Sequence, residues 1–354
     1  MADGTIGVGL IGFGMAGDLF HAPSIAAVHG LKLTAIFARS GSGAAAQAAY
    51  PEVPVVRTVG ELLANPAVEL VVVATPTHSH FEMARQVLLA GRHVVVDKPF
   101  TPTSKEAREL IDLAQAQRRK LAVYQNRRWD SECLTGRKVL QSGVLGELLE
   151  YESHYDRYRP VLRTTWQDQS LPGCGVIYDL GSHVIDTALT LLGLPVAVTA
   201  ELWGQREGTI NPDAFDIRLH YPTVRARLKV SLLNAENGPR LVLHGRRGSY
   251  VKTALDVQEE ALKRHERPGG SGWGEEPRES WGILHTVGED GQTQRQPFKS
   301  EPGNYAAYYE NVRDALLGKA ELAVPGEAGF NVIRTIELAK ESSRLRRTVD
   351  WTND

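Results

Sequence analysis

The sequence predicts an α/β protein of two domains, in which a doubly wound parallel sheet precedes an α/β domain with a large, mostly antiparallel sheet. Three observations predict this fold. The chain has 354 residues, which exceeds one ordinary hydrophobic core. Strand and helix patterns alternate through the first third, as in a parallel sheet. After about residue 125, strand patterns follow one another, which favours antiparallel pairing. We therefore expect domains at residues 1–125 and 126–354.

The elements of the first domain follow from apolar runs and their boundaries. Residues 5–11 are short, apolar and bounded by glycine, which predicts a strand. Residues 68–74 are almost continuously apolar, as in a parallel strand buried on both faces. A helix is expected over 104–118, with Ser104 as its N-cap. The expected strands are 5–11, 31–38, 54–56, 68–74, 93–96 and 121–124, and the other helices are 15–29, 43–50 and 80–90.

The second domain is expected to contain seven further strands, at 147–159, 198–202, 214–221, 224–233, 240–244, 248–252 and 283–287. Asn237-Gly238-Pro239 and the stretch 245–248 are typical of turns between them. Helices are expected at 131–141, 175–192, 305–317 and 326–345. The Gly/Pro-rich stretch from Arg267 to Pro277 predicts a surface loop, and its sequence does not say whether that loop is a lid.

Composition excludes several classes of protein. Lys and Arg number 40 against 42 Asp and Glu, so the net charge of −2 gives no reason to expect a nucleic-acid or membrane partner. Cys133 and Cys174 are the two cysteines, which excludes a disulfide scaffold and favours free thiols without an assigned role. The N-terminus lacks a secretory signal, and no long apolar stretch predicts a transmembrane helix. We expect a cytoplasmic protein.

The first chemical signal is a dinucleotide-binding motif. Residues 12–17 fit G-x-G-x-x-G, follow a predicted strand and open a predicted helix, which is the context that the motif requires. The glycines would make the turn, admit a pyrophosphate and allow close helix packing. Backbone N–H groups at the helix start would bind the phosphate charge. The expected cofactor-binding residues here are Gly12, Phe13, Gly14, Met15, Ala16 and Gly17.

The end of the second strand decides between NAD and NADP. An NAD site has an acidic residue there, to accept hydrogen bonds from the ribose hydroxyls. This chain instead has Arg39 and Ser40. An arginine can pair with a 2′-phosphate and a serine can donate to it. We therefore predict NADP(H), with NAD(H) as the less favoured cofactor.

Lys98 is the first candidate for chemistry. It lies in Asp97-Lys98-Pro99, directly after a predicted parallel strand, where side chains border the ligand crevice. The Lys98–Pro99 peptide bond is a candidate for the cis isomer, because folded proteins use cis proline to make a sharp turn.

Asp179, His183 and Asp186 form the second candidate. Their i, i+4, i+7 spacing places them on one face of the helix expected over 175–192. One interpretation is a metal site. Another is catalysis, with His183 as the base that removes a hydroxyl proton during hydride transfer. A third is a hydrogen-bonded structural pair.

These motifs together resemble the Gfo/Idh/MocA family of NAD(P)-dependent oxidoreductases over essentially the whole chain. Thr75-Pro76 with His80 also matches, whereas Asp97 replaces the family's usual glutamate before Lys-Pro. The resemblance implies an NAD(P)-binding Rossmann domain at 1–125, a substrate-binding and oligomerisation domain at 126–354, and no metal. The implied catalytic residues are Lys98, Asp179 and His183, and the implied further cofactor-binding residues are Thr75, Pro76, His80 and Lys98.

A closer resemblance is to the NADP-dependent scyllo-inositol dehydrogenase branch of that family. It is carried by residues 124–130, 157–160, 178–183, 237–240 and 303–305. That branch interconverts a ring secondary alcohol of a cyclitol with its ketone, and it often has His where this chain has Gln125. The expected substrate-binding residues are Lys98, Asn126, Arg128, Tyr155, Arg157, Asp179 and His183.

Several alternatives stay open. Asn126 and Arg128 could instead link the domains, and Arg157 and Arg159 could cap a neighbouring subunit's edge. The substrate could be an aldose or a deoxy sugar, or the chain could be a non-catalytic NADP-binding regulator. The presence of the complete trio favours an enzyme over a regulator. The resemblance implies a homodimer or homotetramer, and the sequence does not choose between them.

Overall fold

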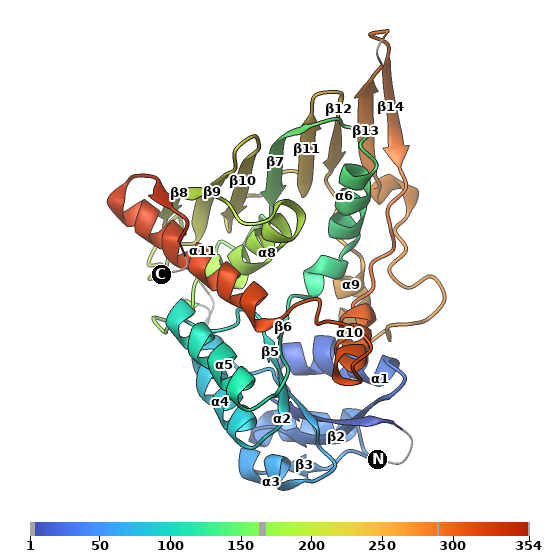
Figure 1. Cartoon of the computed structure of the whole chain (residues 1–354), viewed down its shortest axis with the longest axis vertical. Helices are drawn as coiled ribbons and strands as arrows, with labels where there is room; N and C mark the ends of the chain where they lie inside the picture. The colour runs from blue at the N-terminus through green and yellow to red at the C-terminus, as the bar shows by residue number, and fades with distance from the viewer. Residues whose placement is uncertain (1–3, 163–167, 289, 353–354) are drawn as a thin grey trace. The chain divides into compact units, whose positions relative to one another are not determined.

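The computed structural model describes residues 4–162, 168–288 and 290–352. The chain forms two compact units. The first contains Met1–Asn126, Gln258–Trp273 and Asn304–Phe330, and the second contains Arg127–Val257, Gly274–Gly303 and Asn331–Asp354. The structure confirms the predicted fold class, a parallel sheet followed by a mostly antiparallel one (Figure 1).

The first unit is built on a parallel sheet in the order β3-β2-β1-β4-β5-β6. The order reverses between β1 and β4, which is where doubly wound sheets open a ligand crevice. β4 and the centre of β5 are fully buried, as their apolar sequences predict. The strands are β1 (Ile6–Ile11), β2 (Leu31–Phe37), β3 (Val55–Val56), β4 (Leu70–Val73), β5 (His93–Asp97) and β6 (Leu121–Tyr124).

The helices from η1 to α5 connect these strands, α4 packs against α5, and α9 and α10 join the unit from later in the chain (Figure 1). The expected N-cap Ser104 is wrong, because Thr103 caps α5 and forms a capping box with Glu106. The helix expected over 15–29 consists of a π-helical turn, η1, followed by α1. The helices are η1 (Ala16–His21), α1 (Ala22–Ala27), α2 (Ser40–Ala49), α3 (Val59–Ala64), η2 (Thr77–Ser79), α4 (His80–Leu89), α5 (Ser104–Ala116), α9 (Gln258–Lys263) and α10 (Ala306–Leu316).

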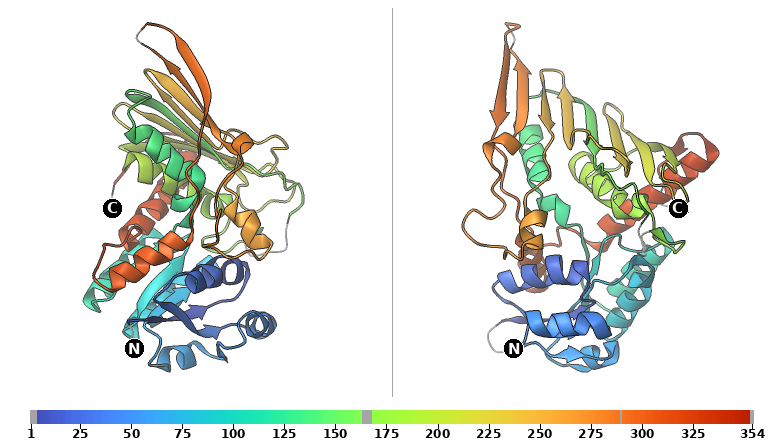
Figure 2. Two further views of the ribbon diagram at one scale, coloured as in Figure 1. Left: turned by 90° about the vertical axis from the view of Figure 1, so that its right-hand side faces the viewer. Right: turned by 180° about the vertical axis from the view of Figure 1, so that it is seen from behind.

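The second unit is built on a nine-stranded sheet in the order β14-β13-β12-β11-β7-β10-β9-β8-β15 (Figure 2). β7 and β10 are parallel, and the other described pairs are antiparallel. The strands are β7 (Leu148–His154), β8 (Ala197–Trp203), β9 (Ala214–His220), β10 (Arg225–Ser231), β11 (Leu241–Gly245), β12 (Gly248–Lys252), β13 (Gly282–Val287), β14 (Thr293–Phe298) and β15 (Val349–Asp350).

Helices α6 and α8 pack on this sheet, and they also contact each other. The helix expected over 175–192 is divided into α7 and α8, and the strand expected over 147–159 ends at His154. The remaining helices are η3 (Asn126–Trp129), α6 (Ser131–Gln141), α7 (Val176–Asp179), α8 (Gly181–Leu192), η5 (Arg278–Ser280) and α11 (Gly326–Leu345). No helix among the described residues is long and apolar enough to cross a membrane.

The predicted loop from Arg267 to Pro277 is irregular, but it is not wholly at the surface. Glu276 is buried, and its Oε2 accepts a hydrogen bond from Lys252 Nζ at 2.6 Å. Both side chains of this ion pair are fully buried. The Gly/Pro-rich sequence around Glu276 gives no sign that its carboxylate is buried.

Candidate functional site

The glycine motif forms a tight turn after β1 in the first unit. Gly12 has φ of 102°, and a Cβ there would lie 2.4 Å from the Ala74 carbonyl oxygen. A Cβ at Gly17 would lie 2.2 Å from the Gly12 carbonyl oxygen, so η1 approaches the strand end closely. A Cβ at Gly14 would meet nothing within 4 Å. Two of the glycines therefore serve packing, while Gly14 leaves open space beside the backbone.

The other three residues of the motif differ in environment. Phe13 is buried, and its ring packs edge-on against Tyr50 with 6.1 Å between centroids. Met15 is exposed, and Ala16 is the first residue of η1. The motif can therefore meet a ligand through backbone N–H groups and through the surface at Gly14 and Met15.

Arg39 lies between β2 and α2 and is exposed. Its carbonyl accepts hydrogen bonds from the Gly43 N–H at 2.9 Å and from the Ser42 hydroxyl at 3.1 Å, which fixes the backbone at this turn. Within the described part of the chain, its guanidinium forms no hydrogen bond or ion pair. Ser40 begins α2, but its side chain lies outside the described residues. Arg39 therefore offers a cation at the end of the second strand.

His80 joins two loops at the carboxyl edge of the parallel sheet. Its imidazole is buried, with Nε2 lying 2.7 Å from the Thr75 carbonyl oxygen and Nδ1 lying 2.9 Å from the Pro99 carbonyl oxygen. Burial lowers the pKa of His80, while the Asp97 carboxylate opposes that shift. Thr75 and Pro76 lie in the first loop, and the Ser79 hydroxyl donates to Thr75 Oγ1 at 2.8 Å. Both imidazole nitrogens face backbone carbonyls, so His80 braces these loops.

Lys98 follows β5, and the predicted cis isomer of the Lys98–Pro99 bond is confirmed. The Lys98 N–H donates to Asp97 Oδ1 at 2.8 Å. Asp97 in turn lies 3.6 Å from Nε2 of His21, whose Nδ1 lies 2.6 Å from the Tyr309 hydroxyl. Burial would raise the pKa of Asp97, but His21 holds it below its usual range. The sequence analysis did not find His21 and Tyr309.

Two buried residues, Gln125 and the remaining candidate Asn126, directly follow β6. Asn126 is 4% exposed and begins η3. Gln125 is 1% exposed, and neither its Nε2 nor its Oε1 has a hydrogen-bond partner among the described residues. An amide that is buried without a partner is costly, and at Gln125 both the nitrogen and the oxygen of the amide are in this state.

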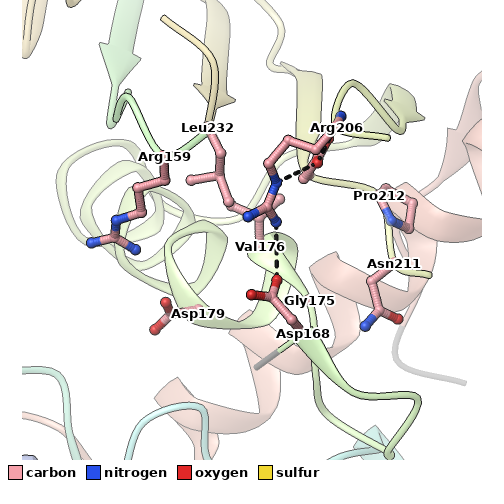
Figure 3. Close-up of a pocket in the computed structure, with 10 residues that line it drawn as sticks. Arg159, Asp168, Gly175, Val176, Asp179, Arg206, Asn211, Pro212 and Leu232 are labelled. Carbon is pink, nitrogen blue, oxygen red and sulfur yellow. Dashed lines mark hydrogen bonds and ion pairs between the residues drawn. The ribbon is translucent and has the colours of Figure 1, made fainter. Parts of the chain in front are cut away.

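In the second unit, Asp179 lines a hollow whose walls carry many charged side chains (Figure 3). The space between these side chains measures about 470 Å³, which includes open solvent. Arg206 is held in its wall by Asp213 Oδ2 at 2.7 Å and by Asp168 Oδ1 at 2.9 Å. The lining residues are Arg159, Asp168, Gly175, Val176, Asp179, Arg206, Asn211, Pro212, Asp213 and Leu232. Such donors and acceptors suit hydroxyl groups.

Four lining residues, Asp168, Arg206, Asn211 and Asp213, were not predicted from the sequence. Asp213 also accepts hydrogen bonds from the N–H groups of Gln205 and Arg206, at 2.7 and 3.2 Å. These contacts close the loop between β8 and β9. The only sequence signal was the turn-rich composition of this loop, which does not show where its side chains point.

The helix divides between Asp179 and His183. Leu180 separates α7 from α8, and the His183 N–H donates to the Leu180 carbonyl at 3.2 Å instead of to Asp179. The regular i, i+4 relation on which the common face was predicted is therefore interrupted. The Ser182 hydroxyl donates to the Asp179 carbonyl at 3.3 Å, which satisfies that group at the break.

His183 and Tyr155 lie together in this unit, with 6.0 Å between their ring centroids. Asp186 receives two hydrogen bonds from the Arg128 guanidinium, at 2.8 and 2.7 Å. This bidentate ion pair is a structural contact within the second unit. The two Arg128 donors that bind Asp186 are not available to a substrate. Arg128 therefore fits the predicted substrate-binding role less well.

The predicted site residues fall into two groups by unit. Gly12 to Gly17, Arg39, Thr75, Pro76, His80, Lys98 and Asn126 belong to the first, and Arg128, Tyr155, Arg157, Asp179 and His183 belong to the second. Among the described residues, no group of three His, Cys, Asp or Glu side chains could hold a metal ion. Cys133 and Cys174 are buried free thiols.

Comparison with known proteins assigns both halves of the chain. Residues 6–125 match a profile described as an oxidoreductase family, NAD-binding Rossmann fold. Residues 137–351 match its companion, an oxidoreductase family C-terminal alpha/beta domain. The chain is therefore an oxidoreductase with an NAD-binding Rossmann domain.

Relatives align over nearly the whole chain. The uncharacterized oxidoreductase YdgJ of Escherichia coli is 45% identical, with 98% of each chain covered. The scyllo-inositol 2-dehydrogenase (NADP(+)) IolW of Bacillus subtilis is 37% identical, with 98% of this chain and 96% of IolW covered. Among solved structures, the putative oxidoreductase yvaA from Bacillus subtilis superposes with a TM-score of 0.95 at 36% identity, with 98% of this chain and 99% of that one covered.

Proposed function

The chain belongs to the Gfo/Idh/MocA family of oxidoreductases, and we propose that it is an NADP-dependent enzyme that interconverts a ring secondary alcohol of a cyclitol with its ketone. The observation that carries the proposal is the 37% identity to a relative named as an NADP-dependent scyllo-inositol 2-dehydrogenase. Residues 1–125 would bind the cofactor, and residues 126–354 would bind the substrate.

The glycine turn of the first unit fits a dinucleotide. Gly12 and Gly17 admit no side chain, whereas the space beside Gly14 is open to a pyrophosphate. Backbone N–H groups at the start of η1 would bind the phosphate oxygens. A dinucleotide held by these residues would supply a nicotinamide for hydride exchange with the substrate carbon. His80 would act indirectly, by bracing the loops of Thr75-Pro76 and Pro99.

Arg39 supports the preference for NADP. Its exposed guanidinium has no partner among the described residues, so it is available to a 2′-phosphate. Arg39→Asp should raise the KM for NADP⁺ strongly and the KM for NAD⁺ much less. Lys32→Asp is a matched control, because Lys32 is an exposed cation near the other end of β2. Equal effects of the two charge reversals on NADP⁺ would contradict the assignment.

Three residues would perform the chemistry. The His183 imidazole takes the hydroxyl proton during oxidation and returns it during reduction. The Lys98 ammonium stabilises negative charge on the reacting oxygen. Asp179, which lines the polar hollow of the second unit, would orient the substrate, with hydrogen bonds from Asn126, Arg128 and Arg157. Lys98→Ala should lower turnover by orders of magnitude and leave cofactor binding largely intact. Turnover at the wild-type rate would refute this role.

A substrate panel tests the proposal as a whole. Purified protein would be given NADP⁺ or NAD⁺ with inositols, aldoses and other polyols, and absorbance of the reduced nicotinamide would be followed. Reduction of NADP⁺ with scyllo- or myo-inositol supports the proposal. Activity with an aldose or deoxy sugar alone would keep the mechanism and replace the substrate class. Tight NADPH binding without turnover across the panel would favour a regulator.

We also propose that the chain forms a homodimer or homotetramer, the default for symmetric oligomers. Size-exclusion chromatography with light scattering measures the mass directly. A monomer at micromolar concentration would contradict this part of the proposal.

A further inference from the structure

We infer that Tyr155 is a positioning residue whose ring, clamped by three guanidinium groups, holds the His183 imidazole in its working orientation. The inference rests on the proposed role of His183 as the acid–base group. It concerns contacts within the second unit only, which bring together residues just after β7, in η3, just before β11 and at the start of α8.

Three arginine side chains lie against the Tyr155 ring and form what we call the clamp. The guanidinium carbons of Arg240, Arg157 and Arg127 lie 4.2, 4.4 and 5.0 Å from the centroid of the Tyr155 ring. A guanidinium within about 6 Å of a ring centroid is attracted to the π electrons. The ring is buried, and the Tyr155 N–H donates to the Lys229 carbonyl at 3.1 Å. The ring is therefore restrained by its burial, its backbone and three cations.

Hydrogen bonds to carboxylates hold two arginines of the clamp in place. Arg240 is buried and donates to Glu132 Oε1 at 2.7 Å and to the His154 carbonyl at 2.9 Å. Burial would raise the pKa of the Glu132 carboxyl, but Arg240 lowers it, so Glu132 stays ionised. Arg127 donates to Asp130 Oδ2 at 3.0 Å. Two of the three cations are thus fixed by carboxylates.

Arg157 differs from the other two cations. Its Nη1 donates to the Asp156 carbonyl at 3.0 Å, and no described carboxylate pairs with it. It is half-buried, and its guanidinium lies against Tyr155. Arg157 is also one of the residues expected to contact substrate. Its guanidinium has a further task, which is to hold the Tyr155 ring.

The Tyr155 ring also contacts the His183 imidazole. The rings of Tyr155 and His183 are 6.0 Å apart at an interplanar angle of 62°, an edge-to-face arrangement. His183 is buried in the first turn of α8, directly after the break at Leu180. An immobile ring beside the imidazole limits its rotation. Acid–base catalysis depends strongly on such orientation, and small misplacements can lower rates by about 10²-fold.

The test compares Tyr155→Phe, which keeps the ring, with Tyr155→Leu, which removes it. We expect Phe, which keeps the ring and its contacts, to lower kcat for scyllo-inositol and NADP⁺ far less than Leu does. We expect Leu to lower kcat by about 10²-fold with little change in the KM for NADP⁺. Tyr250→Leu is the matched control: it removes an equally buried ring that packs on Phe298 in the same sheet. This control should lose stability but keep kcat per folded molecule.

A second readout does not need turnover. In full-length protein with ¹³C-labelled histidine, His183→Asn identifies the His183 imidazole resonance. That resonance should be unchanged in Tyr155→Phe and shifted or broadened in Tyr155→Leu. If the Leu variant fails to fold, Arg157→Met loosens the clamp at a half-buried position and should shift the same resonance.

Two results would overturn the inference. One is a wild-type imidazole resonance and kcat in both Tyr155→Leu and Arg157→Met. The other is a Phe variant as impaired as the Leu variant, which would assign the role to the hydroxyl. Failure of the proposed function has a different signature: either the wild-type protein shows no turnover across the substrate panel, or His183→Asn keeps full activity, whatever the resonance of the Tyr155 variants shows.

Discussion

Gln125→Met should stabilise the protein, although it removes a polar side chain at the end of β6. Gln125 is 1% exposed, and neither atom of its amide has a partner among the described residues. A buried donor or acceptor without a partner costs about 1–3 kcal/mol, and methionine has nearly the same length and shape. We therefore expect the free energy of unfolding to rise by about 1–3 kcal/mol, with a Tm gain of about 2–4 °C per kcal/mol.

Gln258→Met provides the opposite case in the same unit. Gln258 is also fully buried, but its Oε1 accepts hydrogen bonds from the Tyr305 N–H at 2.7 Å and from Trp273 Nε1 at 3.0 Å. Methionine at this position would leave two donors without that acceptor, at a cost of about 1–3 kcal/mol for each buried one.

Urea unfolding and calorimetry of both variants give the comparison. Destabilisation of Gln125→Met similar to that of Gln258→Met would refute the reasoning. It would mean that the Gln125 amide is satisfied in the folded protein. A variant that is more stable but has a raised KM would instead assign the amide to a bound ligand, a common trade between stability and activity.

Three further predictions follow from buried groups. Burial and Arg119 lower the pKa of His93 to about 4, so the folded protein favours the neutral imidazole. This preference contributes at most about 3 kcal/mol to the free energy of unfolding, which is present above pH 6.5 and lost as the pH falls towards 4. Urea unfolding at several pH values should therefore show a smaller loss of stability on the acid side in His93→Asn. Lys252→Met leaves the buried Glu276 carboxylate without its ion-pair partner and should lower the free energy of unfolding by about 3–5 kcal/mol. The double variant Lys252→Met/Glu276→Leu should recover part of that loss. Burial raises the pKa of Cys133 to about 12, so iodoacetamide at pH 8 should label it only after unfolding, as mass spectrometry would detect.

The parallel sheet was predictable because its strands carry their own signal. The apolar runs of β4 and β5 are buried on both faces, and the glycine turn follows β1 directly. Even the missed helix α3 had a local signal. Thr58 caps it by accepting from the Glu61 N–H at 3.1 Å, the same Thr-x-x-Glu pattern that begins α5 at Thr103. Both N-termini could have been found from the sequence.

Other elements have no such signal. β14 (TQRQPF) is almost entirely exposed, so its sequence shows no alternation of apolar and polar residues. It is a strand because its backbone pairs with β13. β15 has two residues, and it is defined by its pairing with β8, which lies about 150 positions earlier in the chain. Pairing with a distant strand is not visible in a short sequence window.

The residues of the candidate site also fall into two kinds, those in local sequence motifs and those brought close by the fold. This difference determines which substitutions should affect activity. The motifs that hold Lys98, Asp179 and His183 are local in sequence, so pattern alone identifies them. Their surroundings are not local: Tyr309 reaches the Asp97 turn through His21, and Arg240 reaches His183 through Tyr155. In the proposed reaction, side chains of this second kind would fix orientation without touching substrate. Substitutions that lower kcat should therefore include residues such as His21 and Tyr309, which lie outside the motifs recognised in the sequence.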